Sequence, residues 1–392
     1  MKKVFASVLS LFIILSACTK QPPAPAAEPE KEAKVTPSPT PSPSPTPEII
    51  YTNGLTGEVL DGKPEPMRPY AVMINNLKPS LPQCGIGDAD VIYEVLAEGE
   101  ITRMMAIFSD IEGVGNIGTI RSVRPYYLDI LQAYDAILVH AGGSEQAYSD
   151  IANEGIQNID QVRGAYPDEI YFRDPDRIKN GTEHALFSTS EKILEYTPIL
   201  EYREEHDTEE YDYGLRFTED AIPLFGKAAN EVNVVYGNNL KESHFAYDES
   251  DGVYHMREFD LDYVDGNTDE KVPFTNVLIL VSEMSDLYDE LGHRDMDIEK
   301  GGQGYFVNGG KYEKITWGMD ADGTFYYDNP QGKELELGVG KTFICMIPTT
   351  SPEPEFLNAD GEAEQLDGEY VNDDEAAEGR LADDEIDDEI ID

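Results

Sequence analysis

The sequence predicts an α/β N-terminal domain, with helices layered on a mixed sheet, followed by a mostly β C-terminal domain. Short apolar runs alternate with helical patterns in the first half, strand-like runs separated by Asp-Gly and Gly-Gly turns fill the second, and both ends lack such patterns. Outside the signal, the tether and the tail, about 300 of the 392 residues remain, enough for two ordinary domains, and a hydrophobic fraction of 40% is enough for a core. We expect the α/β domain over 56–205, a connector over 206–232 and the β domain over 233–350.

The N-terminus is typical of a bacterial lipoprotein signal peptide, over 1–18. Lys2 and Lys3 precede an apolar stretch that is too short to span a bilayer of about 30 Å as a helix. The stretch ends in Leu15-Ser16-Ala17-Cys18, which resembles the lipobox in which a cysteine is lipidated. An ordinary signal peptide with an incidental cysteine is the alternative. We expect a lipid anchor at Cys18 that holds the protein on the extracytoplasmic face of the cell membrane.

A Pro-rich disordered tether is expected over 19–55. Proline fixes φ and favours extended polyproline II, and little in this stretch could be buried in a core. Thirty or so residues at ~3.1 Å each would reach ~90 Å. Such a tether would let the folded part stand off the membrane and into a cell wall.

In the first domain, four compact apolar runs are predicted as strands buried on both faces. They cover 70–74, 90–96, 104–108 and 136–140. A helix beginning at Pro125 is predicted between the third and fourth runs. Its apolar face holds Tyr127, Ile130, Leu131 and Tyr134. A second helix is predicted after the fourth run, with Ser144 as its N-cap and Gly155 as its stop.

In the second domain, strand-like runs follow one another between turns. The predicted strands cover 244–247, 253–259, 277–281, 304–307, 312–317, 324–328, 333–337 and 342–347. The segment 282–292 (SEMSDLYDELG) could instead be a short helix. Cys345 alternates with apolar residues in a strand-like run, so we expect it in the core rather than in a disulfide with Cys84.

The charge of the chain excludes some classes of partner. The net charge is -49, from 78 acidic and 29 basic residues, so the protein should repel nucleic acid and anionic membrane surfaces. Attachment to a membrane would then rest on the lipid. The tail over 351–392 holds 18 Asp and Glu against one Arg and should be disordered, acting as a solubilising segment or a loose ligand for cations or basic partners. No CxxC, HExxH or His/Cys cluster suggests a metal, and we expect no cofactor.

Arginines near the predicted helix starts form a candidate anion site within this acidic chain. Helix N-termini attract anions, arginines grip phosphate or carboxylate bidentately, and ligands of open α/β sheets bind at the carboxyl ends of strands. The candidates are Arg103, Arg121, Arg124, Ser144, Arg173 and Arg177, with Glu94, His140 and His184 as further candidates. The alternative is that each arginine pairs with an acidic neighbour, such as Glu94, Glu98 or Asp174. A Ser144 nucleophile with His140 or His184 lacks a supporting GxSxG motif.

Two stretches carry a resemblance to a known family. They read RPYAVMINNLKPSLPQCGIGDADVIYEVLAEGEITRMMAIFSD and GNIGTIRSVRPYYLDILQAYDAILVHAGGSEQAY. Both are similar to the YerB-like lipoproteins of Gram-positive bacteria, a family built on a domain of unknown function. The resemblance covers about 65–195 and continues more loosely over 230–348. It implies an extracytoplasmic lipoprotein with two domains, and it implies no settled activity.

We therefore expect a membrane-anchored lipoprotein that binds a cell-wall component or an envelope protein. The alternative is an enzyme that acts on an anionic, phosphate-bearing envelope substrate through the arginine-lined site. Solute capture for a transporter is less favoured, because two unlike domains do not suggest paired α/β lobes. Convergence of Arg103, Arg121, Arg124 and His184 would favour an anion site, whereas scattered or sealed arginines would leave only the first expectation.

Overall fold

The computed structural model describes residues 50–364, apart from 100, 208–210, 238–240 and 288–291. Cys18, nearly all of the predicted tether and the last 28 residues of the predicted tail lie outside the described residues. Among the described residues, no helix is long and apolar enough to cross a membrane.

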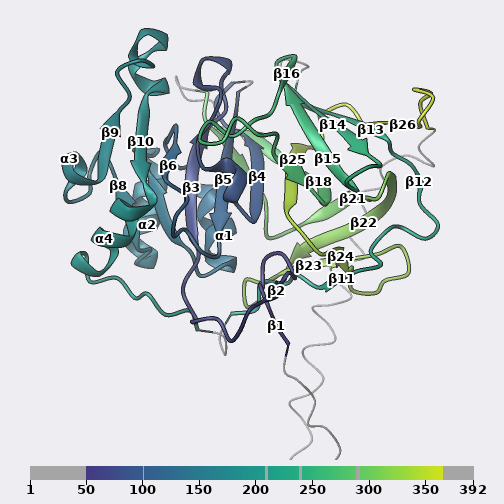
Figure 1. Ribbon diagram of the computed structural model, residues 1–392, viewed down its shortest axis with the longest axis horizontal. Helices are drawn as coiled ribbons and strands as arrows, with labels where there is room; N and C mark the ends of the chain where they lie inside the picture. Colours follow the sequence, from purple (N-terminus) through teal and green to yellow (C-terminus); the bar gives the residue numbers. More distant parts are fainter. Residues whose placement is uncertain (1–49, 100, 208–210, 238–240, 288–291, 365–392) are drawn as a thin grey trace, which may run out of the picture. The chain divides into compact units, whose positions relative to one another are not determined.

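A mixed sheet of eleven strands forms the centre of the fold (Figure 1). In spatial order its strands are β12 (Lys227–Ala228), β22 (Lys311–Met319), β21 (Gly302–Asn308), β18 (Asn276–Ser282), β25 (Thr342–Pro348), β4 (Val91–Leu96), β5 (Thr102–Phe108), β3 (Tyr70–Asn75), β7 (Ile137–His140) and β8 (Asn158–Asp160), with β23 (Phe325–Asp328) beside β22. The four strands predicted in the first half are confirmed as β3, β4, β5 and β7. Every residue in them is buried, as expected of strands covered on both faces.

The two halves of the chain share this sheet. β25 pairs in parallel with β18 on one side and with β4 on the other, the latter from Thr342 opposite Val91 to Met346 opposite Val95. Strands of the second half therefore continue the sheet that the first half begins. The sequence pattern did not indicate this pairing, because two parallel strands that are far apart in the chain have no local sequence signal of their contact.

A second sheet of six strands covers one face of the large sheet around β18 and β25. Its strands are β16 (Leu261–Asp262), β15 (Val253–Glu258), β14 (Lys241–Asp248), β13 (Glu231–Tyr236) and β26 (Glu355–Leu357), with β17 (Pro273–Phe274) beside β15. Phe343 of β25 meets Phe245 and Phe274 edge-on, with ring centroids 5.2 and 5.1 Å apart, so aromatic packing joins the sheets.

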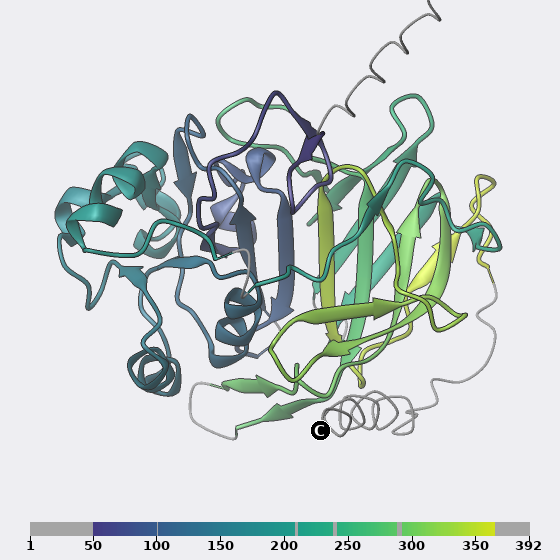
Figure 2. The same ribbon diagram turned by 90° about the horizontal axis from the view of Figure 1, so that it is seen from below.

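The helices gather at the opposite end of the large sheet, around β3, β7 and β8 (Figure 2). They are α1 (Pro125–Ala133), α2 (Glu145–Glu154), α3 (Pro167–Ile170) and α4 (Ser190–Ile199). α1 and α2 confirm the two predicted helices. The Ser144 hydroxyl caps α2 by accepting from the Ala147 amide at 3.2 Å, and Gly155 ends it with φ 70°. A small sheet of β6 (Asn116–Gly118), β10 (Leu186–Thr189) and β9 (Tyr171–Arg173) lies beside these helices.

Several expectations from the sequence are corrected. The helix suggested over 282–292 is wrong where it is described: Met284–Asp286 is strand β19, which pairs with β20 (Arg294–Met296), because a tertiary pairing overrides weak helical spacing. The predicted tether extends too far, since β1 (Tyr51–Thr52) pairs with β2 (Val59–Leu60) and Leu55, in the loop between them, is fully buried. The predicted tail begins too early, because β26 pairs with β13 and buries Phe356.

Smaller differences concern strands and cysteines. The predicted strand over 333–337 is irregular apart from an isolated bridge at Glu334 and its last residue, which begins β24 (Leu337–Gly338), the partner of β11 (Phe217–Thr218). β13 and α4 were missed. Cys84 and Cys345 are both buried and both free, and Cys345 lies in the core as expected.

A buried polar network joins the two halves of the chain. Lys241 of β14 lies between Glu94 of β4 and Glu258 of β15, its Nζ 2.8 Å from Glu94 Oε1 and 2.6 Å from Glu258 Oε1. The three side chains are at most 3% exposed. Asn76 donates to Glu94 Oε1 at 2.8 Å and to Glu258 Oε1 at 3.0 Å. Burial raises the pKa of Glu258 to about 7, with Lys241 opposing the rise and Glu94 adding to it.

Glu258→Gln tests this network through the pH dependence of stability. A folded-state pKa above the ordinary value of 4.5 means that the native state holds the proton more tightly, so the stabilising contribution is full below pH 4.5 and is lost as pH rises through 7. The fall in unfolding free energy between pH 4.5 and 7.5 should therefore be smaller in the variant, by on the order of 2 kcal/mol. Urea unfolding across this range measures the difference.

Glu242→Gln is the matched control, because Glu242 is exposed on β14, the strand that pairs with β15. It should follow the wild type at every pH. An identical pH dependence in the wild type and Glu258→Gln would contradict the assignment.

Candidate functional site

The candidate site begins where a loop enters the large sheet. β3 and β7 pair in parallel up to Val72 and Val139, and the segment 120–123 then lies between their carboxyl ends. The Arg121 amide donates to the Met73 carbonyl at 2.9 Å, and the Arg121 carbonyl accepts from the Ala141 amide at 3.0 Å. This insertion fixes the backbone of Arg121 at the carboxyl ends of the strands, where open α/β sheets bind ligands.

Two buried arginines share one carboxylate at this edge. Arg103 is the second residue of β5 and Arg124 precedes α1, and they are 2% and 5% exposed. Both donate to Glu98 Oε1, Arg103 at 2.5 Å, and Glu98 lies on the turn between β4 and β5. Although partial burial favours the neutral acid, the two arginines lower the pKa of Glu98. One carboxylate thus offsets only one of two guanidinium charges.

These two arginines also leave donor and acceptor capacity unused. Arg103 Nη1 donates to the Ser122 carbonyl at 3.0 Å, and Arg124 Nη1 donates to the Val123 carbonyl at 2.7 Å. Arg124 Nε and Glu98 Oε2 are buried and have no hydrogen-bond partner within the described part of the chain. A buried guanidinium with an unpaired donor is a costly arrangement for a purely structural ion pair.

Arg121 adds a third guanidinium to the pair. Its side chain makes no hydrogen bond or ion pair with another described residue. Burial lowers its pKa, and the nearby Arg103 lowers it further, whereas Glu98 and Glu183 raise it. Arg121 is therefore the cation of this group that is free to bind a ligand.

His184 lies beside Arg121 and completes the group. It precedes β10 and is 5% exposed, and its Nδ1 is 3.0 Å from Asn75 Nδ2 at the end of β3. Burial lowers its pKa below 6.5, with Glu183 raising it and Arg121 lowering it. We call Arg103, Arg121, Arg124, Glu98 and His184 the arginine site.

The remaining candidates at this edge have structural partners. Ser144 caps α2, as described above. His140 is fully buried, with Nδ1 2.8 Å from the Gly142 carbonyl and Nε2 3.0 Å from Asn158 Oδ1. The structure thus holds Ser144 and His140 in local hydrogen bonds rather than as a serine–histidine pair.

Three further candidates lie away from the arginine site. Arg173 is exposed and donates to the Thr182 carbonyl at 2.6 Å, and Arg177 donates to the Ser80 and Pro82 carbonyls at 2.9 and 2.7 Å. Glu94 belongs to the buried network with Lys241. Of the predicted arginines, Arg103, Arg121 and Arg124 converge, whereas Arg173 and Arg177 stabilise loops.

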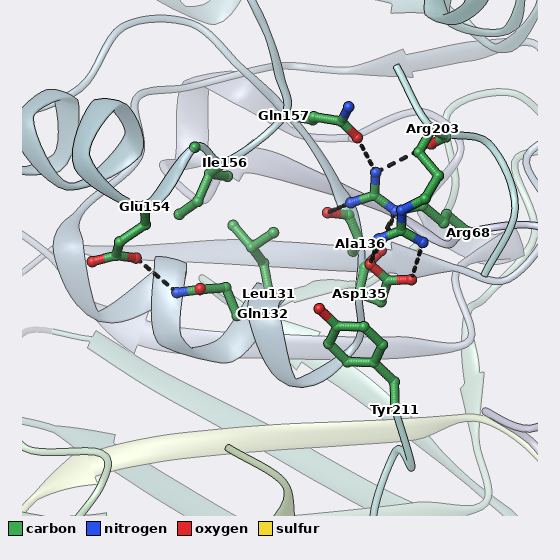
Figure 3. A pocket seen from close by; sticks show the side chains of 11 residues that line it. Arg68, Leu131, Gln132, Asp135, Ala136, Glu154, Ile156, Gln157, Arg203 and Tyr211 are labelled. Carbon is green, nitrogen blue, oxygen red and sulfur yellow. Dashed lines mark hydrogen bonds and ion pairs between the residues drawn. The ribbon is translucent and has the colours of Figure 1, made fainter. Parts of the chain in front are cut away.

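A cavity of about 280 Å³ lies at the other end of these strands, beside the amino ends of β3, β7 and β8 (Figure 3). Asp135, with a side chain 2% exposed, accepts from Arg203 Nη1 at 2.8 Å and lies 3.1 Å from both Arg68 Nε and His206 Nδ1. Although burial favours the neutral acid, hydrogen bonds from His206 and Arg203 lower the pKa of Asp135 to about 2. We call this cluster the Asp135 clamp, and its paired charges indicate a structural role.

One exposed group could be mistaken for a metal site. Ligand atoms of Asp248, Asp251 and His255 lie within 4.8 Å of one another at the turn between β14 and β15. Asp248 accepts from the Ser250 amide at 2.8 Å, so its carboxylate already holds the turn. This group gives no reason to expect a bound metal.

Sequence reasoning missed residues whose partners are distant in the chain. Lys241 and Glu258 meet Glu94 only through the pairing of the two halves, and the Asp135 clamp joins Arg68 to Arg203. The one available signal was Glu94 itself, an acid inside the apolar run VIYEVL. Such an acid requires a buried partner, although the sequence does not say which one.

Comparisons with known proteins confirm the resemblance seen in the sequence. Two models of the family described as "Protein of unknown function (DUF3048)" match, the N-terminal domain at 55–203 and the C-terminal domain at 232–344. The chain is 30% identical over 299 residues to "Putative lipoprotein YerB" of Bacillus subtilis (strain 168), covering 75% of this chain and 85% of that protein. The crystal structure of the YerB protein from Bacillus subtilis is similar with a TM-score of 0.65 and 26% identity, covering 76% of this chain and 97% of that one.

Asp135→Asn tests the structural role of the Asp135 clamp. Breaking a buried ion pair leaves uncompensated guanidinium groups, so the unfolding free energy at pH 7 should fall by about 3 kcal/mol. Because the folded-state pKa lies below the ordinary value of 3.8, this contribution is present above pH 3.8 and is lost as pH falls towards 2. Urea unfolding at pH 7 and at pH 2.5 measures both effects.

Asp212→Asn is the control, since its pair with Arg216 is exposed and should contribute less than about 1 kcal/mol. Equal losses in the two variants would show that Asp135 has no special role.

Proposed function

The chain belongs to the DUF3048 family, and from this we propose that it is a membrane-anchored lipoprotein of the cell envelope that binds an anionic, phosphate-bearing ligand at the arginine site. The observation that carries the proposal is the convergence of three arginines with one carboxylate between them. A relative in Bacillus subtilis bears the name of a lipoprotein, which supports the envelope location.

The charge balance of the arginine site supports anion binding over internal pairing. Arg103, Arg121 and Arg124 contribute three positive charges, and Glu98 offsets one of them. In a chain of net charge -49, a local positive excess at partly buried positions is unexpected unless an anion completes it. Charge-assisted hydrogen bonds from guanidinium groups to phosphate are among the stronger polar contacts in proteins.

Binding is favoured over turnover as the function of this site. The one histidine in the group, His184, is held by Asn75, and Ser144 and His140 are occupied elsewhere. An enzyme acting on a phosphate-bearing envelope substrate stays the alternative, because the same arginines would stabilise the charge of a phosphoryl group. Release of phosphate from a bound lipid phosphate would favour that alternative.

The proposed lipid anchor is attached to Cys18, which lies outside the described residues. A net charge of -49 gives the folded part no electrostatic attraction to an anionic membrane. The lipid at Cys18 would then hold the protein at the surface, and the Pro-rich segment would set its distance from the membrane.

Arg121→Gln tests the anion site. The variant loses the one guanidinium of the site that has no partner among the described side chains, so the affinity of the full-length protein in detergent for inorganic phosphate should fall about tenfold. Glu98→Gln should act in the opposite direction, because it removes the competing carboxylate. Isothermal titration calorimetry at pH 7 measures both.

Arg257→Gln serves as the control, since Arg257 has a side chain 50% exposed on the second sheet. Its affinity should equal that of the wild type. Failure of the wild type to bind phosphate, or equal affinities in Arg121→Gln and Arg257→Gln, would argue against the site.

Cys18→Ala tests the anchor. Without lipid, the protein should shift from the membrane fraction to the medium, because nothing in its net charge favours an anionic surface. Fractionation and immunoblotting measure the distribution, with Cys84→Ser as the control that keeps Cys18. Retention of Cys18→Ala at the membrane would contradict the lipid anchor.

A further inference from the structure

We propose that the arginine site selects a doubly charged anion of the phosphate-monoester type, and that His184 takes up a proton when this anion binds. The inference rests on the proposed anion site and goes further, because it names the charge state of the ligand and the residue that becomes protonated when the ligand binds. It follows from the tautomer of His184, the charges around it and its place beside Arg121.

The tautomer of His184 is set by a chain of hydrogen bonds. The Leu77 amide donates to Asn75 Oδ1 at 3.2 Å, so the amide nitrogen Nδ2 of Asn75 points the other way. Asn75 Nδ2 then donates to the Glu183 carbonyl at 3.1 Å and to His184 Nδ1 at 3.0 Å. Since Nδ1 accepts, the proton of a neutral His184 is on Nε2.

The groups that face His184 keep it neutral before a ligand binds. Burial favours the uncharged imidazole, and the neighbouring Arg121 adds to this effect. The carboxylate of Glu183, whose Oε1 lies 3.6 Å from His184 Nε2, acts in the opposite sense and is 49% exposed. An exposed carboxylate is screened by water, so burial dominates and the pKa of His184 is lowered.

A bound dianion would reverse this balance. Within the arginine site, Arg103, Arg121 and Arg124 contribute three positive charges and Glu98 one negative charge, and this net positive charge opposes a proton on His184. A dianion beside Arg121 would cancel this positive excess and place two negative charges next to the imidazole, which raises the affinity of His184 for a proton. The proton enters at Nδ1 of His184 while Nε2–H stays a donor, so Asn75 must rotate its amide to accept from the imidazolium.

A singly charged anion gives a different result. It would cancel only half of the positive excess and leave the arginine site positively charged, so it would favour the charged imidazole less than a dianion does. Phosphate monoesters carry close to two negative charges at pH 7, whereas diesters carry one. Proton uptake at His184 therefore favours the terminal phosphate of a ligand over a phosphodiester within a polymer.

Sulfate is the probe that isolates the histidine, because it keeps two negative charges across the pH range of interest. As pH falls from 8 to 6, the affinity of the full-length wild type for sulfate should rise, by at most about tenfold per pH unit for one proton. Whatever its affinity at pH 8, His184→Gln should show no such rise as pH falls to 6. Calorimetry in two buffers of different ionisation enthalpy measures the proton uptake directly.

His255→Gln is the matched control, since His255 lies on the second sheet and should leave the rise unchanged. If His184→Gln fails to fold, proton uptake by the wild type still decides the inference, because its absence overturns it. An equal rise in His184→Gln would also overturn it, as would dimethyl phosphate binding as tightly as phosphate at pH 7. Absence of sulfate binding at every pH would instead overturn the proposed anion site.

Discussion

The parallel pairing of β25 with β4 is the constraint on which the rest of the fold depends. It places five residues of the last long strand of the large sheet beside the second strand of the first half. Glu94 thereby lies opposite Cys345 and faces the second sheet, where Lys241 and Glu258 meet it. A buried acid in β4 is tolerable only because this pairing brings a cation to it. The two halves are thus joined by backbone ladder bonds and by one shared set of buried charges.

Where β3 ends and β5 begins, the large sheet has the buried network on one face and the arginine site on the other. Side chains alternate along a strand, so neighbours face opposite ways. Thr102 donates to Glu94 at 2.7 Å, and the next residue, Arg103, reaches Glu98. In the same way Asn76 contacts Glu94, and Asn75 holds His184. The positions of Arg103 and His184 are therefore set by strand residues whose immediate neighbours are fixed in the core, which limits how far the arginine site can move.

The sequence predicted those parts of the fold that depend on local patterns. The apolar runs of β3, β4, β5 and β7 and the N-cap of α2 needed no distant partner. The order of the large sheet did need one, since β25 and β4 lie far apart in the chain. For the arginine site, the sequence predicted that Arg121 and Arg124 lie near the start of α1. It did not indicate which of several acidic residues pairs with the arginines, and the structure shows that Glu98 does. The sequence around Arg177 looks like that around Arg121. Only the structure shows that Arg177 donates to the Ser80 and Pro82 carbonyls and stabilises a loop, whereas the Arg121 guanidinium has no such partner among the described residues.

The acidity of the chain shapes how an anion would reach this site. Long-range repulsion from a net charge of -49 opposes the approach of any anion, but screening limits it to about 8 Å at physiological ionic strength. Within that distance, the guanidinium groups of Arg103, Arg121 and Arg124 dominate, because they are partly buried and act through a lower effective dielectric. Added salt weakens these contacts and also weakens the repulsion, so the two effects oppose each other. An anion bound at the proposed arginine site would therefore be selected at contact range, by charge state and geometry, rather than by attraction from solution.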